Sequence, residues 1–233
     1  MPSSFIDALL NTPRPIIMEI KRRGAHGQDL LGGRPLSEVV ATYEAAGAPC
    51  LSVVTGHWFG GSAALLHEIA SLTRLPLLIK DFVTKEEQII EARDAGASAV
   101  LLTARILPKS VLRHLVEASR RQGVTPFVEV ACAEELEGLE FSGCVVAVNN
   151  KDILHRERGP AVIARSPALL PAILASGTSC PVSASGIDSP VLAARLLDAG
   201  FKALLIGTGL LMADDIGAWV AAVDRHRREP EAA

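Results

Sequence analysis

Short runs of aliphatic residues recur along the chain, separated by longer segments whose apolar residues follow the period of an amphipathic helix. Three runs follow a glycine set between small or apolar residues: Ala46-Gly47-Ala48 before Cys50–Thr55, Ala95-Gly96-Ala97 before Ala99–Thr103, and Ala199-Gly200-Phe201 before Ala203–Ile206. A glycine at this place supplies the left-handed residue that commonly ends a helix. The repeated unit is therefore helix, glycine and buried strand, which is half of a βα repeat.

The pattern extends to eight alternations of strand and helix. Strands are predicted at Ile16–Lys21, Cys50–Thr55, Leu75–Asp81, Ala99–Thr103, Thr125–Val130, Cys144–Asn149, Pro181–Ser185 and Ala203–Gly207. Helices are predicted at Leu36–Ala46, Ser62–Leu72, Lys85–Ala95, Lys109–Gln122, Ala133–Leu139, Ser166–Ser176, Ser189–Ala199 and Asp214–Arg227. Eight such units in 233 residues predict an α/β fold, a single (β/α)8 TIM barrel. A doubly wound open sheet is the structural alternative.

Several boundaries of these elements carry signals of their own. Thr84 with Glu87 fits a capping box, and Ser189-Pro190 fits an N-cap followed by proline at the first helical position. No linker interrupts the pattern, so residues 1–233 are predicted to form one domain with a frayed tail at about 228–233. The segment Arg22–Pro35 is long for a loop between a strand and a helix, and such a loop in a barrel is usually functional.

Composition supports this fold and narrows the range of partners. Hydrophobic residues make up 49% of the chain but aromatic ones only 4%, so the apolar content is mostly aliphatic, as buried parallel strands require. A net charge of −3 gives no global field that would attract nucleic acid or an anionic membrane. No apolar run reaches the roughly 20 residues of a membrane span, and the N-terminus lacks the pattern of a secretion signal. We expect a cytoplasmic monomer or weak homo-oligomer that binds neither nucleic acid nor membrane.

Neither the cysteines nor the histidines indicate a metal centre. The four cysteines are Cys50, Cys132, Cys144 and Cys180. They form no C-x-x-C pair and lie in or beside apolar runs, which favours small buried side chains over ligands or disulfides. His26, His57 and His155 fall in predicted loops and lack ligand spacing. The scattered methionines and tryptophans are interpreted as packing residues, and no metal is expected.

Charged residues close several of the predicted strands, which are otherwise apolar. Glu19 and Lys21 end the first strand, Lys80 the third and Glu129 the fifth. In a barrel, the catalytic residues come from the carboxyl ends of the strands, and alternation places Glu19 and Lys21 on the same face. Structural ion pairs across the barrel mouth are one interpretation. We favour an acid–base site, because two lysines and two glutamates converge from three strands.

The last three strands end in small and polar residues. Ser185-Gly186-Ile187 and Gly207-Thr208-Gly209 follow strands seven and eight, where barrels often bind phosphate through backbone N–H groups. Tight turns are the alternative interpretation of these glycines. Asn149 and Asn150 close the sixth strand and can either orient a substrate hydroxyl or cap a turn, and Lys151 can hold an anion.

These residues resemble indole-3-glycerol phosphate synthase, a barrel enzyme of tryptophan synthesis, along nearly the whole chain. The matching segments are, in order, Glu19-Ile20-Lys21, Leu51-Ser52-Val53-Val54-Thr55, Phe59-Gly60-Gly61-Ser62, Lys80-Asp81-Phe82, Gln88, Glu91-Ala92-Arg93, Leu101-Leu102, Val128-Glu129-Val130, Asn149-Asn150, Ser185-Gly186-Ile187 and Ala213-Asp214-Asp215. No single triplet is specific, but the ordered set is.

The resemblance implies a lyase that closes an indole ring on a phosphorylated carboxyphenylamino-deoxyribulose. Carbon dioxide and water leave, and neither a cofactor nor a metal takes part. By resemblance, Lys80 is the general acid that protonates the ketone oxygen. Glu129 assists the dehydration, and Asn149 positions Glu129. Glu19 and Lys21 orient the substrate and share the proton transfers.

The same resemblance implies which residues bind the substrate. Phe59 and Phe82 would line an aromatic pocket. Ser185 and Lys151 would contact the substrate, and Gly186 would join the phosphate-binding group. Gly207, Thr208 and Gly209 complete that phosphate-binding group.

The chain also departs from the family pattern at both ends of the implied site. Ala184 stands where the family has glutamate, and Lys151 stands where it has an arginine, whose bidentate fork is thereby lost. Gly24 begins the segment that replaces the family's Ser-Pro-Ser, and Gly209 replaces a serine that helps to hold phosphate. Gly56 follows Thr55 where the family usually has aspartate. The acid–base centre is therefore retained while side chains that grip the substrate are lost.

Three functions remain open at this point. The first is an indole-3-glycerol phosphate synthase. The second is a diverged paralogue in specialised metabolism that uses the same lysine–glutamate centre for cyclisation, decarboxylation or dehydration of another substrate. The third is a non-catalytic barrel, which would have no need of two lysines and two glutamates at its strand ends.

Overall fold

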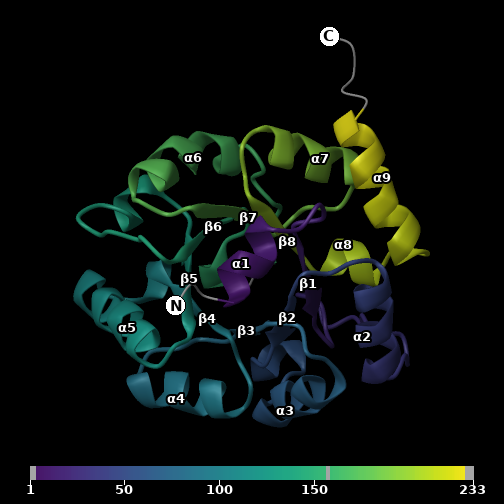
Figure 1. Cartoon of the computed structure of the whole chain (residues 1–233), viewed down its shortest axis with the longest axis horizontal. Helices are drawn as coiled ribbons and strands as arrows, with labels where there is room; N and C mark the ends of the chain where they lie inside the picture. Colours follow the sequence, from purple (N-terminus) through teal and green to yellow (C-terminus); the bar gives the residue numbers. More distant parts are fainter. Residues whose placement is uncertain (1–3, 156–157, 229–233) are drawn as a thin grey trace.

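Eight parallel strands form a closed barrel in the computed structural model, which describes residues 4–155 and 158–228 (Figure 1). The strands are β1 (Ile16–Ile20), β2 (Leu51–Val54), β3 (Leu77–Lys80), β4 (Ala99–Thr103), β5 (Thr125–Val130), β6 (Val145–Asn149), β7 (Cys180–Ala184) and β8 (Ala203–Ile206). Each strand pairs with the next in the sequence, and β8 pairs back to β1, with Met18 opposite Ile206. The predicted (β/α)8 TIM barrel is confirmed, and the open sheet is excluded.

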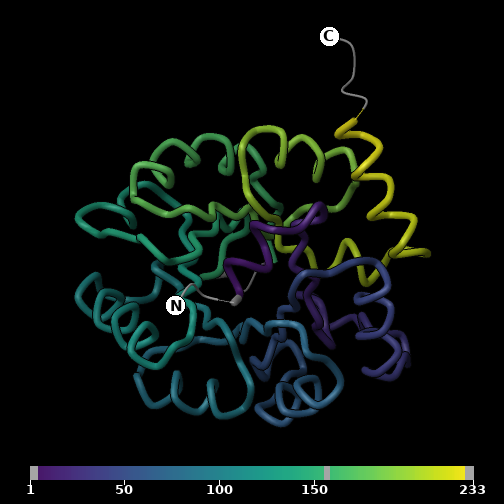
Figure 2. The backbone as a smooth tube through the Cα atoms, viewed as in Figure 1, coloured from purple at the N-terminus to yellow at the C-terminus, as the bar shows by residue number. Residues whose placement is uncertain are grey.

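Helices surround the barrel on its outer side, as the backbone trace shows (Figure 2). The outer helices are α2 (Leu36–Ala45), α3 (Ala63–Leu72), α4 (Glu86–Asp94), α5 (Lys109–Arg121), α6 (Arg165–Ala175), α7 (Pro190–Asp198) and α9 (Ile216–Arg228). Short helices follow the carboxyl ends of five strands: η1 (His57–Phe59), η2 (Ala104–Ile106), η3 (Ala133–Glu135), η4 (Ile153–His155) and α8 (Thr208–Leu211). These short helices form part of the barrel mouth.

The predicted helix at Ala133–Leu139 is wrong. The structure has only the single turn η3 in this segment, and the chain then reverses direction through Gly138, whose φ is +70°. Seven residues are too few to form a stable helix without a strong apolar face. Four glutamates within Glu134–Glu140 leave little apolar surface here to pack on the sheet. The connection between β5 and β6 is therefore irregular.

Two predicted helix starts have different outcomes. The capping box of Thr84 and Glu87 is wrong, because α4 begins at Glu86 and its third residue is Gln88. The Gln88 side-chain oxygen accepts from the backbone N–H groups of Thr84 and Lys85, at 2.8 and 3.1 Å. The N-cap at Ser189 is confirmed, since its hydroxyl accepts from the Leu192 N–H at 3.3 Å.

The C-terminal helix extends slightly past its predicted end. Arg228 still belongs to α9, and residues 229–233 of the predicted frayed tail lie outside the described part of the chain. Among the described residues, no helix has the length and apolar character that crossing a membrane would require.

Helix α1 (Ser4–Leu10), which the sequence pattern did not predict, closes one end of the barrel. It lies across the ring of strands in Figure 1. Its Phe5, Ile6 and Leu9 belong to the same buried cluster as the inward side chains at the amino ends of the strands. The Phe5 ring meets the Phe127 ring edge to face, with centroids 6.4 Å apart and planes at 88°. The amino-terminal end of the barrel is thus filled with apolar side chains.

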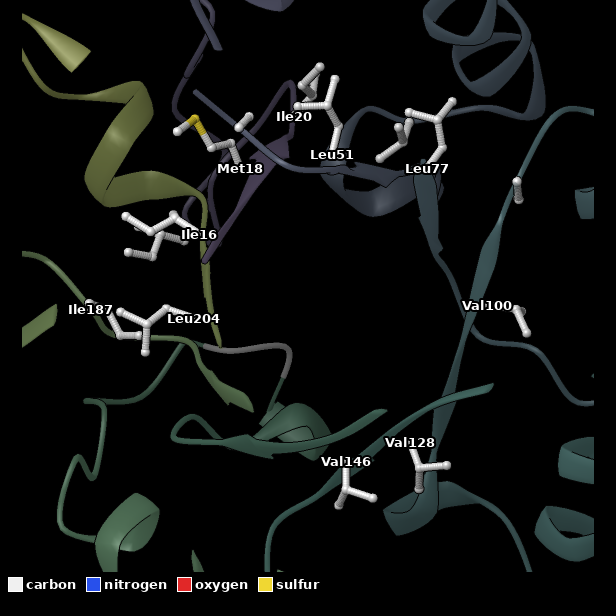
Figure 3. Packing of buried hydrophobic residues seen from close by; sticks show 14 of the residues in the cluster. Ile16, Met18, Ile20, Leu51, Leu77, Val100, Val128, Val146, Ile187 and Leu204 are labelled. Carbon is white, nitrogen blue, oxygen red and sulfur yellow. The ribbon is translucent and has the colours of Figure 1, made fainter. Parts of the chain in front are cut away.

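Strand alternation divides the buried side chains into two cores. Those that point outward pack under the helices, and Figure 3 shows several of them, including Val100, Val128 and Val146, arranged around the ring of strands. Those that point inward form the second core, which includes Ile17 and Leu205. Because α1 fills the amino-terminal end of this interior, polar inward side chains gather at the carboxyl end, where the strands open to the mouth.

We expect Phe5→Ala to lower the free energy of unfolding by about 3–5 kcal/mol, because it removes a buried ring and leaves a cavity that the surrounding side chains cannot fill. Urea unfolding followed by circular dichroism measures this loss. Leu10→Ala is the matched control from the same helix, since Leu10 is 42% exposed and should change stability little. Equal losses in both variants would show that α1 does not close the barrel as described.

Candidate functional site

A buried carboxylate lies between two lysines at the barrel mouth. Glu19 lies on β1 and Lys21 directly follows that strand, while Lys80 is the last residue of β3. The Glu19 Oε1 atom is 3.3 Å from Lys21 Nζ, and its Oε2 atom is 3.1 Å from Lys80 Nζ. Only 2% of Glu19 is exposed. The convergence that the sequence predicted for these three residues is confirmed.

Neighbouring elements leave room for this carboxylate and fix its backbone. A Cβ atom on Gly207, at the end of β8, would lie 2.4 Å from Glu19 Oε1, so any side chain there would displace the carboxylate. From α2, the buried hydroxyl of Tyr43 donates a 3.0 Å hydrogen bond to the Glu19 backbone oxygen. The absence of a side chain at Gly207 therefore leaves the space that the Glu19 carboxylate occupies in the ion-paired cluster.

The charge state of Glu19 follows from two opposing effects. Burial raises its pKa, but the charges of Lys80 and Lys21 and their hydrogen bonds lower it by more. The net result lowers the pKa of Glu19 to about 2. Glu19 is therefore ionised at neutral pH and forms ion pairs with both ammonium groups, which are placed to donate a proton or attract an anion.

A small apolar pocket of about 30 Å³ opens on one side of the cluster. Lys21, Lys80 and Glu129 line it together with Phe59 and Phe82. The Lys21 Nζ atom is 5.3 Å from the centre of the Phe59 ring, within the range of a cation–π contact. The structure thus places Glu129 and both predicted aromatic residues beside the lysines.

Trp58 also lines this pocket, so its interpretation as a packing residue is wrong, whereas Trp219 does pack against the hydrophobic core. Its ring centre lies 5.4 Å from that of Phe82 and 3.9 Å from that of His57. A signal was present in the sequence, because Trp58 immediately precedes Phe59 in the loop that follows β2. Only the folded structure brings that loop over β3 and Phe82.

A larger cavity of about 570 Å³ opens on the other side of the same lysines. Besides Glu19, Lys21 and Lys80, its lining contains six of the predicted residues: Lys151, Ser185, Gly186, Gly207, Thr208 and Gly209. Met212 and Trp219 form part of the wall on the α8 and α9 side, so they too are more than core packing. Lys21 and Lys80 therefore join an aromatic half of the site to a half lined by glycines and hydroxyls.

Asn149 is buried at the end of β6 but lines neither cavity. Its Oδ1 atom accepts a 2.8 Å hydrogen bond from the Lys151 N–H, which shapes the start of the next loop. Within the described chain, its Nδ2 atom has no hydrogen-bond partner. No hydrogen bond therefore joins this Nδ2 atom to Glu129 in this structure, and a buried amide donor remains unused.

Asp81 supports the site and was not among the predicted site residues. Its Oδ2 atom accepts from the Thr55 hydroxyl at 2.9 Å, and its Oδ1 atom accepts from the Phe82 N–H at 2.8 Å. These bonds fix the turn that carries Phe82 and connect the ends of β2 and β3. The signal was its position directly after Lys80 at a strand end.

The described residues contain no cluster of three or more histidine, cysteine, aspartate or glutamate side chains that could hold a metal ion. All four cysteines are free, and three of them are buried. Burial raises the pKa of Cys144 to about 11 and that of Cys180 to about 12, so both are protonated thiols at neutral pH. The chemistry available at the mouth is therefore that of lysines and carboxylates.

Comparison with known proteins gives one consistent result. The family model described as indole-3-glycerol phosphate synthase matches residues 2–223. The indole-3-glycerol phosphate synthase of Pyrococcus furiosus is 36% identical over 206 residues, which cover 86% of this chain and 87% of the relative. The one from Methanothermobacter marburgensis is 37% identical, covering 92% and 75%. The one from Aquifex aeolicus is 32% identical, covering 91% and 81%.

We expect Glu19 to make the stability of the protein depend on pH in the acid range. The shift of its pKa from 4.5 to about 2 corresponds to about 3 kcal/mol, present in full above about pH 5 and lost as the pH falls toward 2. Glu19→Gln lacks this contribution. The difference in free energy of unfolding between wild type and Glu19→Gln should therefore narrow from pH 6 to pH 3 in urea titrations. Exposed Glu87→Gln is the control, and a constant difference for Glu19→Gln would contradict the assignment.

Proposed function

Because the chain belongs to the indole-3-glycerol phosphate synthase family, we propose that its Lys21–Glu19–Lys80 cluster is the acid–base centre of that reaction. The chain is a lyase of this ring-closing type, acting on a small phosphorylated substrate. The observation that carries the assignment is that both lysines line both cavities. A substrate with an aryl ring at one end and a phosphate at the other would span the two halves and place its reacting ketone between the lysines.

Lys80 is proposed as the general acid. Its ammonium group, held 3.1 Å from the Glu19 carboxylate, would donate a proton to the ketone oxygen as the ring carbon attacks the carbonyl carbon. Carbon dioxide then leaves the ring carbon, and its bonding electrons restore the aromatic ring. Glu19, which carries no proton at neutral pH, would hold the Lys80 ammonium group and, with Lys21, orient the substrate and share the proton transfers. Each turnover consumes one proton, which is taken up from water.

Glu129 is proposed to assist the dehydration. It lines the same pocket as Lys80, on the β5 side, with 2% of the residue exposed. The hydroxyl formed from the ketone would leave as water when a lysine ammonium group of the same pocket donates a proton to it, and the Glu129 carboxylate would take up the proton that the substrate loses. Asn149 is proposed to position Glu129 from the end of the neighbouring strand β6, since it lines neither cavity itself.

The glycine-rich half of the site is proposed to bind the phosphate. Ser185 and Thr208 supply hydroxyls, and Gly186, Gly207 and Gly209 leave the backbone open to an anion. A Cβ atom on Gly209 would lie 2.6 Å from the Ile187 backbone oxygen, so the serine of the family pattern would not fit without a backbone shift. The loss of that serine is thus tied to a close approach of the loops after β7 and β8.

The aromatic half is proposed to bind the aryl ring. Phe59, Phe82 and Trp58 offer ring faces and edges to it. Lys151 lines the larger cavity instead, where it supplies one positive charge for an anionic substrate group. A lysine binds such a group as a point charge, whereas an arginine would grip it with two parallel hydrogen bonds. We therefore expect this chain to hold the substrate carboxylate in a less fixed orientation than a family member with arginine at this position.

The direct test is an assay of ring closure with the purified chain and the carboxyphenylamino-deoxyribulose phosphate. We expect turnover, and we expect Lys80→Met to lower kcat by about 10²–10⁴-fold, the usual contribution of a general acid. Exposed Lys85→Met on the same loop is the control and should keep the wild-type rate. Turnover that survives Lys80→Met would remove Lys80 from the mechanism. A wild-type chain without turnover would overturn the proposed reaction.

A diverged paralogue with another substrate is the second candidate, favoured by Ala184. This residue is fully buried on β7, faces the barrel interior and pairs across the sheet with Asn149. An alanine where the family has glutamate removes a carboxylate from beside the free Nδ2 atom of Asn149. The substrate of this chain would then supply the group that the family places there.

If the chain is such a paralogue, Ala184→Glu combined with Lys151→Arg should raise kcat/KM for the family substrate by about tenfold or more, because each restores an interaction with a charged group, typically worth about 1.5–3 kcal/mol. The control is Ala168→Glu with Lys202→Arg, which makes the same chemical changes at exposed positions. Steady-state kinetics decides the outcome. A wild-type rate already equal to that of the relatives, unchanged by the double variant, would exclude the paralogue.

A further inference from the structure

Asn150 is hydrogen-bonded through both ends of its side-chain amide, and no step of the proposed reaction uses it. It follows β6 directly and is fully buried. Its Nδ2 atom donates to the backbone oxygens of Ala184 and Ser185, at 3.0 and 3.2 Å, and approaches the Ser183 hydroxyl at 3.2 Å. Its own backbone N–H donates to the Ala184 oxygen at 3.0 Å. One residue thus holds the last turn of β7 from two sides.

Two serines fix the orientation of this amide. The Ser166 hydroxyl, from the first turn of α6, donates to Asn150 Oδ1 at 2.9 Å. The Ser183 and Ser166 hydroxyls lie 2.7 Å apart, and because Ser166 gives its proton to Asn150, Ser183 is the donor of that pair. The three side chains form one continuous hydrogen-bonded network in which both hydroxyl protons have an acceptor. Such a buried network is rigid, since no member can rotate without losing a bond.

The turn that Asn150 holds is strained. Ser185 has a φ of +68°, the one left-handed non-glycine residue among those described. A residue with a side chain persists in this region only when its surroundings impose it, and such residues concentrate at functional sites. The hydrogen bond from Asn150 Nδ2 to the Ser185 oxygen lies within that turn. Ser185 and Gly186 both line the large cavity.

Asn150 also fixes the opposite wall of the same cavity. The Val162 N–H donates to the Asn150 backbone oxygen at 2.7 Å, next to Pro160 and Ala161, which line the cavity. The two walls meet here, because a Cβ atom on Gly186 would lie 2.2 Å from the Ala161 Cβ atom. A shift at Asn150 would therefore change the spacing of both walls.

We propose that Asn150 is a positioning residue that holds Ser185 in its left-handed conformation and so shapes the anion-binding half of the site. This inference rests on the proposed phosphate site. Asn150 touches neither cavity itself and acts through the backbone of Ser185 and Gly186. Its replacement should weaken binding of the anion while leaving the lysine–glutamate chemistry intact.

The test measures inorganic phosphate binding by calorimetry and, where the chain turns over the family substrate, the split between KM and kcat. Asn150→Ala should weaken phosphate binding and raise KM by about tenfold or more, with kcat changed less than threefold, because even a 1 Å misplacement can be this costly. Ser166→Ala keeps the Asn150 amide but removes the hydrogen bond that orients it. This variant should therefore also weaken phosphate binding and raise KM, but by less than Asn150→Ala. Exposed Asn11→Ala, at the other end of the barrel, is the control.

A double-mutant cycle separates positioning from general stability. Glycine adopts the left-handed conformation without strain, whereas alanine does not. Asn150→Ala should therefore cost about tenfold in phosphate affinity in a Ser185→Ala background but at most about threefold in a Ser185→Gly background. Thermal unfolding of each variant confirms that it is folded. Equal losses in both backgrounds, or an unchanged phosphate Kd in both Asn150→Ala and Ser166→Ala, would overturn the inference.

The outcomes also separate this inference from the proposal on which it rests. If the wild-type protein binds no phosphate at millimolar concentrations, the phosphate site itself is wrong, and the role of Asn150 falls with it. If the wild type binds phosphate and Asn150→Ala binds it equally well, only the positioning role is wrong.

Discussion

The burial of one ionised carboxylate sets the requirements for the rest of this site. Glu19 is nearly inaccessible to water, and a buried charge is stable only when it is paired. Lys21, directly after its own strand, and Lys80 across β2 supply that pairing, so β1 and β3 must hold a fixed register. Gly207 must stay a glycine for the same reason, because any side chain would occupy the space of the carboxylate. The ion-paired cluster of Glu19, Lys21 and Lys80 therefore also restricts which strand register and which residues the barrel mouth can have.

The barrel meets this constraint by separating its interior into two parts. At the amino-terminal end, α1 inserts Phe5 and its neighbours among the apolar inward side chains of the strands. At the carboxyl end, the inward positions carry charges and amides, and the surrounding loops form two cavities that share Lys21 and Lys80. Stability and chemistry thus come from opposite ends of the same strands, which lets loops after the strands diverge without loss of the core.

Strands and the charged residues at their ends could be predicted because local sequence determines them. Buried parallel strands are aliphatic throughout, and a glycine ends several of the helices before them. What could not be predicted depended on contacts distant in sequence. The helix α1 is defined by packing inside the barrel, and Trp58 becomes part of the site only when its loop lies over Phe82. The helix expected at Ala133–Leu139 failed for the opposite reason, since apolar periodicity without enough length or apolar surface does not sustain one.

The departures from the family pattern have a physical order. The residues that pair with the buried carboxylate are retained, whereas Gly24, Lys151 and Gly209 stand in segments that follow the strands. Ala184 is the exception, because it is buried on β7 and faces the barrel interior. Gly209 lies against the Ile187 backbone oxygen, and the Asn150 amide donates to the backbone oxygen of the left-handed Ser185, so main-chain positions shape the half of the site proposed to bind the anion. A site shaped by backbone positions can lose a serine side chain and still keep the geometry proposed to bind an anion. It cannot lose the amide of Asn150 so easily, because no other described side chain bonds to the backbone oxygens of both Ala184 and Ser185.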